Sequence, residues 1–230
     1  MASKRFAQAA QLVDHKIQYT IDRAVALLKQ FPPTKFDETV EISAALQIDP
    51  KKTDQLVRGT VTLPHGTGKV RRVAVFCKGE KEMQAKEAGA EFVGGAELIA
   101  KVQGGWMDFD VAVATPDFMR EVSKLGKILG PRGMMPNPKL GTVTDDVAKA
   151  VTDVKQGKVE FKMDKLSNIH FIIGKRSFAP AQLIDNGRVA LEAIVRARPS
   201  SMKGRMFRSL TLSSTMSPGI PLTVEGLESE

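Results

Sequence analysis

The sequence predicts an α+β fold that is interrupted in its middle by a three-layer α/β segment. In the first and last thirds of the 230 residues, amphipathic helices are mixed with strands that alternate between apolar and polar residues, as in a sheet with one face on a core. In the middle third, short and almost wholly apolar strands alternate with helices, which is typical of a parallel sheet covered on both faces. The pattern alone leaves open whether the two outer parts form one core.

The first third contains a predicted helix and two predicted strands. The stretch TIDRAVALLKQFPP predicts an amphipathic helix that has Thr20 as its N-cap and stops at Pro32. In KFDETVEISAAL the apolar residues Val40, Ile42 and Ala44 fall on one side, so a strand with one buried face is expected. A second strand is expected in RGTVTL.

From about residue 68 to residue 158, strands and helices alternate. The stretches VRRVAVFC and FDVAVATP have the composition of buried strands, and EFV is a shorter one. Helices are expected in EKEMQAKEAGA and AELIAKVQ, and a further single helix over DFMREVSKLGKILG with Asp117 as its cap. This order, with short connections, predicts a small three-layer α/β domain.

The final third returns to the mixed pattern of the first. KVEFKMDKLSNIHFIIG alternates on both sides of a polar turn and predicts a β-hairpin, and APAQLIDNGRVALEAIVRA predicts a helix. GRMFRSLTLSSTM predicts another strand, in which Leu210 and Leu212 face away from Ser209, Thr211 and Ser213.

The charge balance favours a polyanionic partner. The chain has 34 Lys and Arg against 26 Asp and Glu, which gives a net charge of +8 and a pI near 9.6, although many plain soluble proteins are also basic. Trp and Tyr occur once each, so a site built on stacking aromatic rings is disfavoured.

Cys77 is the only cysteine, which excludes an intramolecular disulfide and favours a reducing compartment. No stretch has the length of a signal peptide core or a membrane span, so a soluble, cytoplasmic protein is expected.

Motifs for catalysis, nucleotides or metals are incomplete. HGTGKV lacks the first glycine and the final hydroxyl residue of a phosphate-binding loop, because Leu63 and Val70 stand in those places. The turn KGEKEM lacks the glycine spacing of a dinucleotide site. The histidines, His15, His65 and His170, are scattered and suggest neither a metal site nor a catalytic triad. We therefore expect no cofactor, no metal and no enzymatic activity.

The polar faces of the outer strands are candidates for binding. If the strands are neighbours, one face of a sheet is lined by Thr39, Glu41, Ser43, Lys162, His170, Ser209, Thr211, Ser213 and Thr215. Hydroxyl, imidazole and ammonium groups suit contacts with phosphates and 2'-hydroxyls, as recognition of RNA by shape requires. The alternative is an ordinary solvated sheet face.

The stretch KILGPRGMMPNPKLGTVT, residues 127–144, identifies a family. Its prolines cannot continue a helix, and the run LGPRGMMPNPK closely resembles the signature of bacterial members of the universal L-one family of large-subunit ribosomal proteins. Three further stretches agree with that family in the expected order: KFDETVE, VRGTVTLPHGTGK and SLTLSSTMSP. The resemblance covers essentially the whole chain.

The resemblance implies a discontinuous α+β domain, residues 1–67 and 159–230, that carries an inserted three-layer α/β (Rossmann-like) domain, residues 68–158. It implies that the protein binds large-subunit rRNA at the mobile stalk and assists the movement and release of deacylated tRNA from the exit site. It further implies repression of translation through the protein's own operon mRNA. Other ribosomal components are implied partners, the protein being a monomer within the ribosome and having no membrane partner.

The resemblance also implies which residues bind RNA. Carried over by motif, the rRNA-binding residues are Lys35, Phe36, Thr39, Glu41, Lys165, His170, Ser213, Thr215, Met216 and Ser217. The family usually has TMG where this chain has TMS, so Ser217 adds a side chain at the expected contact. The stretch DKLSN, which contains Lys165, also departs from the glycine-containing turn that the family usually has at this position.

The family signature loop is expected to act away from the main rRNA site, in the inserted domain. It comprises Gly130, Pro131, Arg132, Gly133, Pro136, Asn137, Pro138 and Lys139. The glycines permit turns, the prolines stiffen the segment and the two cations keep it basic. Our hypothesis is that it shapes the inserted domain near the hinge or its secondary contacts with RNA or tRNA. Two alternative functions are a stand-alone translational repressor and a nucleotide-dependent enzyme.

Overall fold

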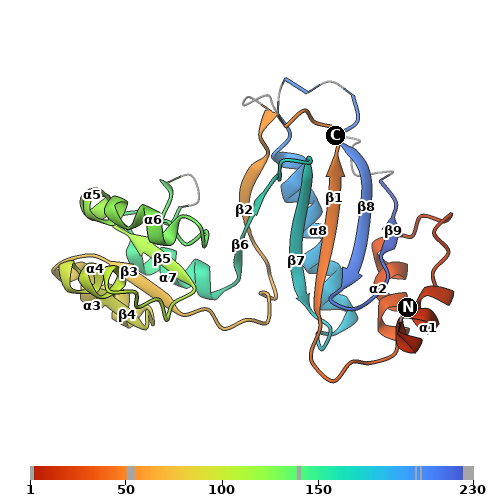
Figure 1. Ribbon diagram of the computed structural model, residues 1–230, viewed down its shortest axis with the longest axis horizontal. Coiled ribbons are helices and arrows are strands. Elements are labelled where there is room, and N and C mark those ends of the chain that lie inside the picture. The colour runs from red at the N-terminus through yellow and green to blue at the C-terminus, as the bar shows by residue number, and fades with distance from the viewer. Residues whose placement is uncertain (1–2, 51–54, 139–140, 200, 203, 225–230) are drawn as a thin grey trace. The chain divides into compact units, whose positions relative to one another are not determined.

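The computed structural model of the protein describes residues 3–50, 55–138, 141–199, 201–202 and 204–224. Its contacts group into two compact units, and each is described by itself (Figure 1). The outer unit is Met1–Gly68 with Val159–Glu230, and the inserted unit is Lys69–Lys158. The boundary lies one residue beyond the position, residue 67, that was expected from the sequence.

The outer unit is built on a four-stranded sheet in the order β7-β1-β8-β9. Its strands are β1 (Thr39–Leu46), β7 (Asn168–Lys175), β8 (Phe207–Ser214) and β9 (Ile220–Leu222), and each neighbouring pair is antiparallel. Helices α2 (Ile21–Gln30) and α8 (Pro180–Arg196) pack against each other and against this sheet. Figure 1 shows α8 behind β7 and β1, with no labelled helix in front of β7, β1 and β8.

Apolar and polar residues alternate along β1, and the apolar ones lie on the buried side, as predicted. Val40, Ile42 and Ala44 are buried in the core, whereas the intervening residues are half-exposed. The strand prediction is therefore confirmed, as are the helices over α2 and α8 and the strand over β8. Thr20 is the N-cap residue of α2, but its side chain makes no capping hydrogen bond. Helix α1 (Lys4–Gln11) and strand β9 were not predicted.

The hairpin predicted over residues 158–174 is wrong in its pairing. Strand β6 (Lys158–Lys162) pairs with β2 (Arg58–Thr62) in a separate two-stranded sheet, whereas β7 pairs with β1. One cause is a close approach at Gly59, where an added Cβ would lie 2.6 Å from Cζ of Phe161. The glycine therefore lets the Phe161 ring of β6 lie directly over β2, and local alternation cannot reveal such a partner.

The polar turn between β6 and β7 does form. The Asp164 carboxylate accepts hydrogen bonds from the amides of Leu166 and Asn168, at 2.8 and 2.7 Å, as in an Asx turn. These bonds lower the pKa of Asp164, the one from the Asn168 amide most. Ser167 takes a positive φ of 65° and its hydroxyl donates to the Ile48 carbonyl at 2.7 Å. The turn is thus fastened to the chain that continues from β1.

The inserted unit contains a three-stranded parallel sheet in the order β4-β3-β5. Its strands are β3 (Val73–Phe76), β4 (Phe92–Gly94) and β5 (Val111–Ala114), with helices α3 (Glu80–Glu87), α4 (Ala96–Gln103) and α7 (Val147–Lys155). Alternate residues of β3 enter two separate hydrophobic clusters: Ala74 and Phe76 join one with residues of α4, and Val73 and Val75 join another with residues of α7. The apolar runs therefore mark strands that are covered on both faces.

The single helix predicted over residues 117–130 is also wrong. The structure has four short pieces: η2 (Pro116–Phe118), α5 (Met119–Val122), η3 (Ser123–Leu125) and α6 (Gly126–Leu129). The N-cap is Thr115 and not Asp117, which lies in the first turn. Two features favour the break: the Ser123 hydroxyl donates to the Met119 carbonyl at 2.6 Å, and Gly126 has low helix propensity.

Cys77 follows β3 and is fully buried. Burial raises the pKa of its thiol to about 11, with a further contribution from the negative charge of Glu82. A neutral thiol of this kind is unreactive, which agrees with the interpretation of Cys77 as a small core residue.

Within the described ranges, no three His, Cys, Asp or Glu side chains form a group that could hold a metal ion. No helix in the described part of the chain is long and apolar enough to span a membrane.

Candidate nucleic-acid interface

The exposed face of the outer sheet brings polar residues together in cross-strand rows. The registers of β7, β1 and β8 give three rows: Asn168, Ala45 and Ser209; His170, Ser43 and Thr211; Ile172, Glu41 and Ser213. Residues that are directly opposite in an antiparallel pair point to the same face. In the second row, Nδ1 of His170 lies 3.1 Å from Oγ of Ser43. Of the strands considered in the sequence, β1, β7 and β8 are therefore neighbours that share one polar face.

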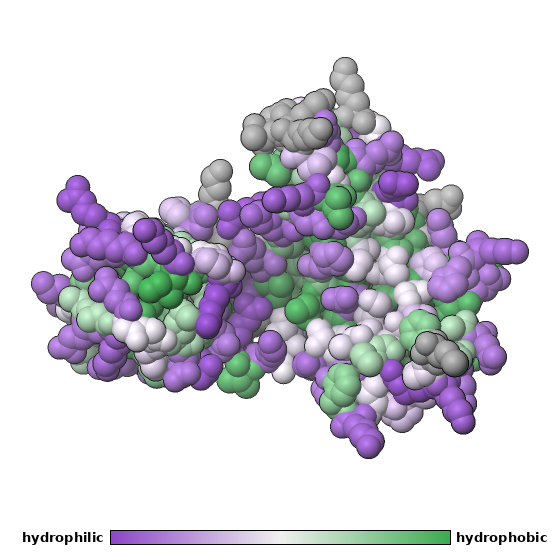
Figure 2. Space-filling view, viewed as in Figure 1, coloured by the Kyte–Doolittle hydropathy of each residue, from purple (hydrophilic) through white to green (hydrophobic). Residues whose placement is uncertain are grey.

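One member of the predicted face is misplaced. Lys162 belongs to β6, which pairs with β2, so it does not lie on the four-stranded sheet. Figure 2 shows hydrophilic and intermediate residues over the front of the outer unit, with hydrophobic ones scattered among them. Ile172, which sequence reasoning did not include, is a large apolar residue in the middle of this polar face, where it is 37% exposed.

The face ends at a tight turn, residues 214–217, that follows β8. The amide of Ser217 donates to the carbonyl of Ser214 at 3.1 Å, which closes the turn. Thr215 fastens it to β1, because its amide donates to the Thr39 carbonyl at 3.1 Å and its Oγ1 accepts from the Thr39 amide at 3.0 Å. Lys175 adds a cation here and donates to Oγ1 of Thr39 at 2.9 Å. Lys175 was missed in the sequence analysis.

Ser217 turns its hydroxyl onto its own turn. Its Oγ accepts from the Ser214 amide at 2.8 Å and lies within hydrogen-bonding distance of the Pro218 carbonyl, at 3.0 Å. Ser217 does not adopt a positive φ, so its backbone has no need of a glycine. The serine therefore stabilises the turn from inside.

The predicted RNA-binding residues fall into two groups along the strands. Met216 and Phe36 are half-exposed, at 51% and 53%, and Phe36 precedes β1 at the end where Thr39 meets the turn. Lys165 lies in the β6–β7 turn beside the opposite end of β1, where the Leu46 amide donates to the Ser167 carbonyl at 2.8 Å. At about 3.3 Å per residue, the seven steps along β1 separate these ends by roughly 20 Å.

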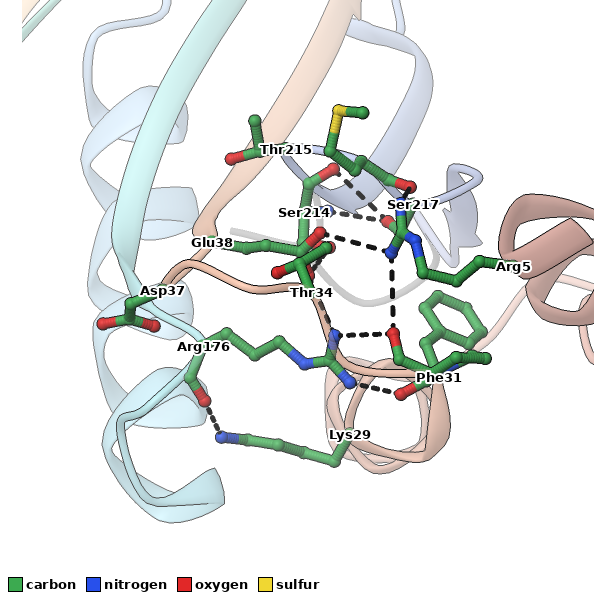
Figure 3. Close-up of polar contacts among 12 residues, drawn as sticks. Arg5, Lys29, Phe31, Thr34, Asp37, Glu38, Arg176, Ser214, Thr215 and Ser217 are labelled. Carbon is green, nitrogen blue, oxygen red and sulfur yellow. Dashed lines mark hydrogen bonds and ion pairs between the residues drawn. The ribbon is translucent and has the colours of Figure 1, made fainter. Parts of the chain in front are cut away.

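A buried carboxylate lies beneath the turn and was also missed. Glu38 has no exposed side-chain area, and its Oε2 lies 2.9 Å from Nη1 of Arg176 and accepts from the Ser214 hydroxyl at 3.1 Å. Arg176 also donates to the carbonyls of Phe31 and Pro32 (Figure 3). The sequence contained an indication of this burial. Glu38 lies two positions before the buried Val40, and residues two apart in an extended chain point to the same side.

Positive charge accumulates at this end of the sheet. Lys29 donates hydrogen bonds to the carbonyls of Arg176 and Phe178. Burial, followed by the neighbouring charge of Arg176, lowers the pKa of Lys29. The negative charge of Asp37 opposes this lowering. The site therefore holds the cations Lys29 and Arg176 beside two carboxylates, those of the fully buried Glu38 and of Asp37.

The signature loop lies in the inserted unit. An added Cβ at Gly130 would lie 2.5 Å from the Gly126 carbonyl oxygen, so glycine is required at that position. Gly133 takes a positive φ of 70°, and Met134 and Met135 pack against the cluster that contains Phe76. Hydrogen bonds between Asn137 and Thr142, from backbone and hydroxyl groups, close the far side of the loop. Arg132 is exposed, and Lys139 lies outside the described residues.

The geometry defines a mixed α/β protein that has an exposed polar sheet face ending in a braced turn. The chain belongs to the Ribosomal protein L1p/L10e family, whose model matches residues 28–218. The resemblance noted in the sequence is thereby confirmed. The protein is a ribosomal protein and not an enzyme.

Relatives cover almost the whole chain. It is 54% identical over 220 residues to the large ribosomal subunit protein uL1 of Bifidobacterium longum (strain DJO10A), which covers 96% of each chain. It is 54% identical over 220 residues to the protein of the same name from Salinispora tropica, covering 96% of this chain and 92% of the relative. For Salinispora arenicola the identity is 53%, with the same coverage.

Proposed function

We propose that this protein is a structural component of the large ribosomal subunit and that its outer unit binds large-subunit rRNA. The observation that carries the proposal is the set of cross-strand rows that end at the braced turn of residues 214–217. They place hydroxyl, imidazole and carboxylate groups on one uncovered face, beside several cations. Family membership supplies the second support, since the relatives are large ribosomal subunit proteins.

The chemistry of the face suits RNA held by its backbone and sugars. Hydroxyls of Ser213 and Thr215 would bind sugar and phosphate oxygens, and Lys35 would supply charge. Glu41 lies opposite Ser213 and would accept hydrogen bonds from 2'-hydroxyls or base amino groups, which favours selectivity over simple adhesion. His170 and Lys165 would extend the contact along the sheet to its other end.

The proposal assigns different tasks to the two units. The outer unit would be the discontinuous rRNA-binding domain at the mobile stalk, and the inserted unit would be a Rossmann-like domain with helices on both sides of its parallel sheet. The protein would be a monomer within the cytoplasmic ribosome. Its neighbours there would be other ribosomal components and the tRNA of the exit site.

The proposal includes a role for the signature loop in the release of deacylated tRNA. Replacing Arg132 and Lys139 with alanine is expected to alter the rate of tRNA release from reconstituted ribosomes, because each change removes a cation from a segment that is proposed to contact the tRNA polyanion. Affinity of the free protein for rRNA should stay within about twofold, since those residues lie outside the outer unit. Replacing the exposed Lys86 and Lys101 with alanine gives a control with the same charge change. If the loop variant lost rRNA affinity to the same extent as its tRNA release changed, this assignment of the loop would be refuted.

Binding to the protein's own operon mRNA is also proposed, because an RNA that resembles the rRNA site would fit the same face. A protein that acts only as a translational repressor would bind that mRNA without being part of the ribosome. Cosedimentation with large subunits distinguishes the two functions, since only a ribosomal component should remain with the subunits through a salt wash.

The direct test measures affinity for the rRNA stalk fragment and for an unrelated structured RNA across a salt series. Adhesion of a +8 protein rests on the release of counterions, so it should weaken steeply for both RNAs as salt rises. Specific binding should keep an advantage of roughly a thousandfold or more for the stalk fragment. Equal affinities at every salt concentration would refute the proposed function.

A further inference from the structure

Arg5 connects helix α1 to the turn at the end of β8. Its Nη2 donates to the Met216 carbonyl at 2.9 Å, and its Nη1 lies 3.6 Å from Oε1 of Glu38 and donates to the Pro32 carbonyl at 3.5 Å. Figure 3 shows Arg5 reaching from its helix toward Glu38, with Ser217 beside it. Arg5 and Met216 are 211 positions apart, so no local pattern in the sequence predicts the contact.

Helix α1 contributes little to the hydrophobic core. Of its eight residues, Ala9 is the buried one, and an isolated helix of this length is marginal in water. Arg5 and Ala9 are four positions apart and so share one face of the helix. The packing of Ala9 therefore orients the same face that presents Arg5 to the turn.

The contact fixes the orientation of one peptide group in the turn. The carbonyl of Met216 and the amide of Ser217 belong to one planar peptide unit. The amide donates to Ser214, and the carbonyl accepts from Arg5. Without Arg5, only one edge of that peptide would be held, and its carbonyl dipole would be free to face the phosphates of a bound RNA.

Glu38 in turn holds Arg5. Its Oε2 is occupied by Arg176 and Ser214, whereas its Oε1 has no hydrogen bond within the described part of the chain and is approached by Arg5. A buried carboxylate oxygen without compensation is costly, so the pair favours the conformation of Arg5 that reaches Met216. The side chain of Arg5 is 24% exposed.

We propose that Arg5 is a positioning residue of the RNA site: together with Glu38 it holds the turn of residues 214–217 in the conformation that binds RNA. The inference rests on the proposed function of the outer unit. It assigns to the N-terminal helix a part in recognition although Arg5 need not touch the RNA. Preorganisation of this kind raises affinity because less ordering remains to be done on binding.

The test compares Arg5→Gln and Arg5→Lys in the full chain, with Lys4→Gln as a matched control that removes a neighbouring exposed charge of the same helix. Arg5→Gln is expected to bind the rRNA stalk fragment roughly tenfold more weakly, with an unchanged slope of log affinity against log salt. Arg5→Lys should bind the fragment little better than Arg5→Gln, because one ammonium group cannot contact Met216, Pro32 and Glu38 together. Lys4→Gln should bind like the wild type.

Two further measurements separate positioning from other roles. In the free protein, the Ser217 amide should exchange with deuterium faster in Arg5→Gln, while the amides between β1 and β7 keep their protection. In a double-mutant cycle with Met216→Glu, the two losses should be less than additive, because the carboxylate at position 216 faces the RNA phosphates only while the turn keeps its conformation.

The results that would overturn the inference are distinct from those that would refute the proposed function. If Arg5 bound a phosphate directly, the salt slope would fall by about 0.7 to 0.9 and Arg5→Lys would restore binding. Unchanged exchange at Ser217, or undiminished RNA affinity in Arg5→Gln, would also overturn it. Lack of preference for the stalk fragment in the wild type would refute the proposed function instead, and the exchange measurement would still decide whether Arg5 holds the turn.

Discussion

Replacing Glu38 with alanine is expected to destabilise the outer unit by about 3 kcal/mol, because removing one partner of a buried ion pair leaves the other partners uncompensated. Arg176 and Arg5 would lose their shared carboxylate, and the Ser214 hydroxyl would lose its acceptor. The carboxylate itself is fully buried, so water would not replace it without rearrangement.

The two units allow this prediction to be measured with an internal control. Trp106 is the only tryptophan and packs between Phe92 and Phe109 in the inserted unit. In urea, the midpoint of its fluorescence should therefore stay unchanged in Glu38→Ala. The part of the far-ultraviolet circular dichroism that belongs to the outer unit should unfold at lower urea, and two transitions should be resolved.

Glu41→Ala is the matched control for the stability measurement. It removes the same group three positions along the chain, at a half-exposed position of β1, where a change within about 0.5 kcal/mol is expected. A loss of stability in Glu41→Ala equal to that in Glu38→Ala would show that the burial of Glu38 is not the cause. An unshifted dichroism transition in Glu38→Ala would contradict the prediction directly.

Replacing Met216 with glutamate is expected to weaken binding to the rRNA stalk fragment roughly 100-fold. The change places a carboxylate on the exposed tip of the turn, where the proposed interface meets phosphates, and like charges at an interface cost several kcal/mol. Stability should stay within about 0.5 kcal/mol, because the Met216 side chain is 51% exposed and only its backbone carbonyl is bound by Arg5.

Met83→Glu provides the matched control for this binding measurement. Met83 is 68% exposed on α3 in the inserted unit, so the substitution makes the same change in charge far along the chain from the turn. Affinity of this variant should remain within about twofold of the wild type at each salt concentration. Equal losses in the two variants would mean that net charge, and not the turn, sets the affinity.

The sequence by itself determined most of the elements of this protein. Alternation with a period of two is a local property, so Val40, Ile42 and Ala44 marked the buried side of β1 without any knowledge of its partners. The polar residues between them marked the exposed face for the same reason. Apolar runs likewise identified β3 and β5, and the signature loop identified the family.

Only the tertiary structure decided which strands pair and which charges meet. Hydrogen bonds between strands depend on residues distant in sequence, so the pairing of β6 with β2 moved Lys162 off the predicted face. The helix predicted around Asp117 is broken into short pieces, where the Ser123 hydroxyl bonds to the Met119 carbonyl and Gly126 has low helix propensity. Arg5 reaches Met216 across almost the whole chain, because burial of Glu38 makes a distant cation favourable there. Local pattern fixes what each segment forms, whereas packing fixes what it touches.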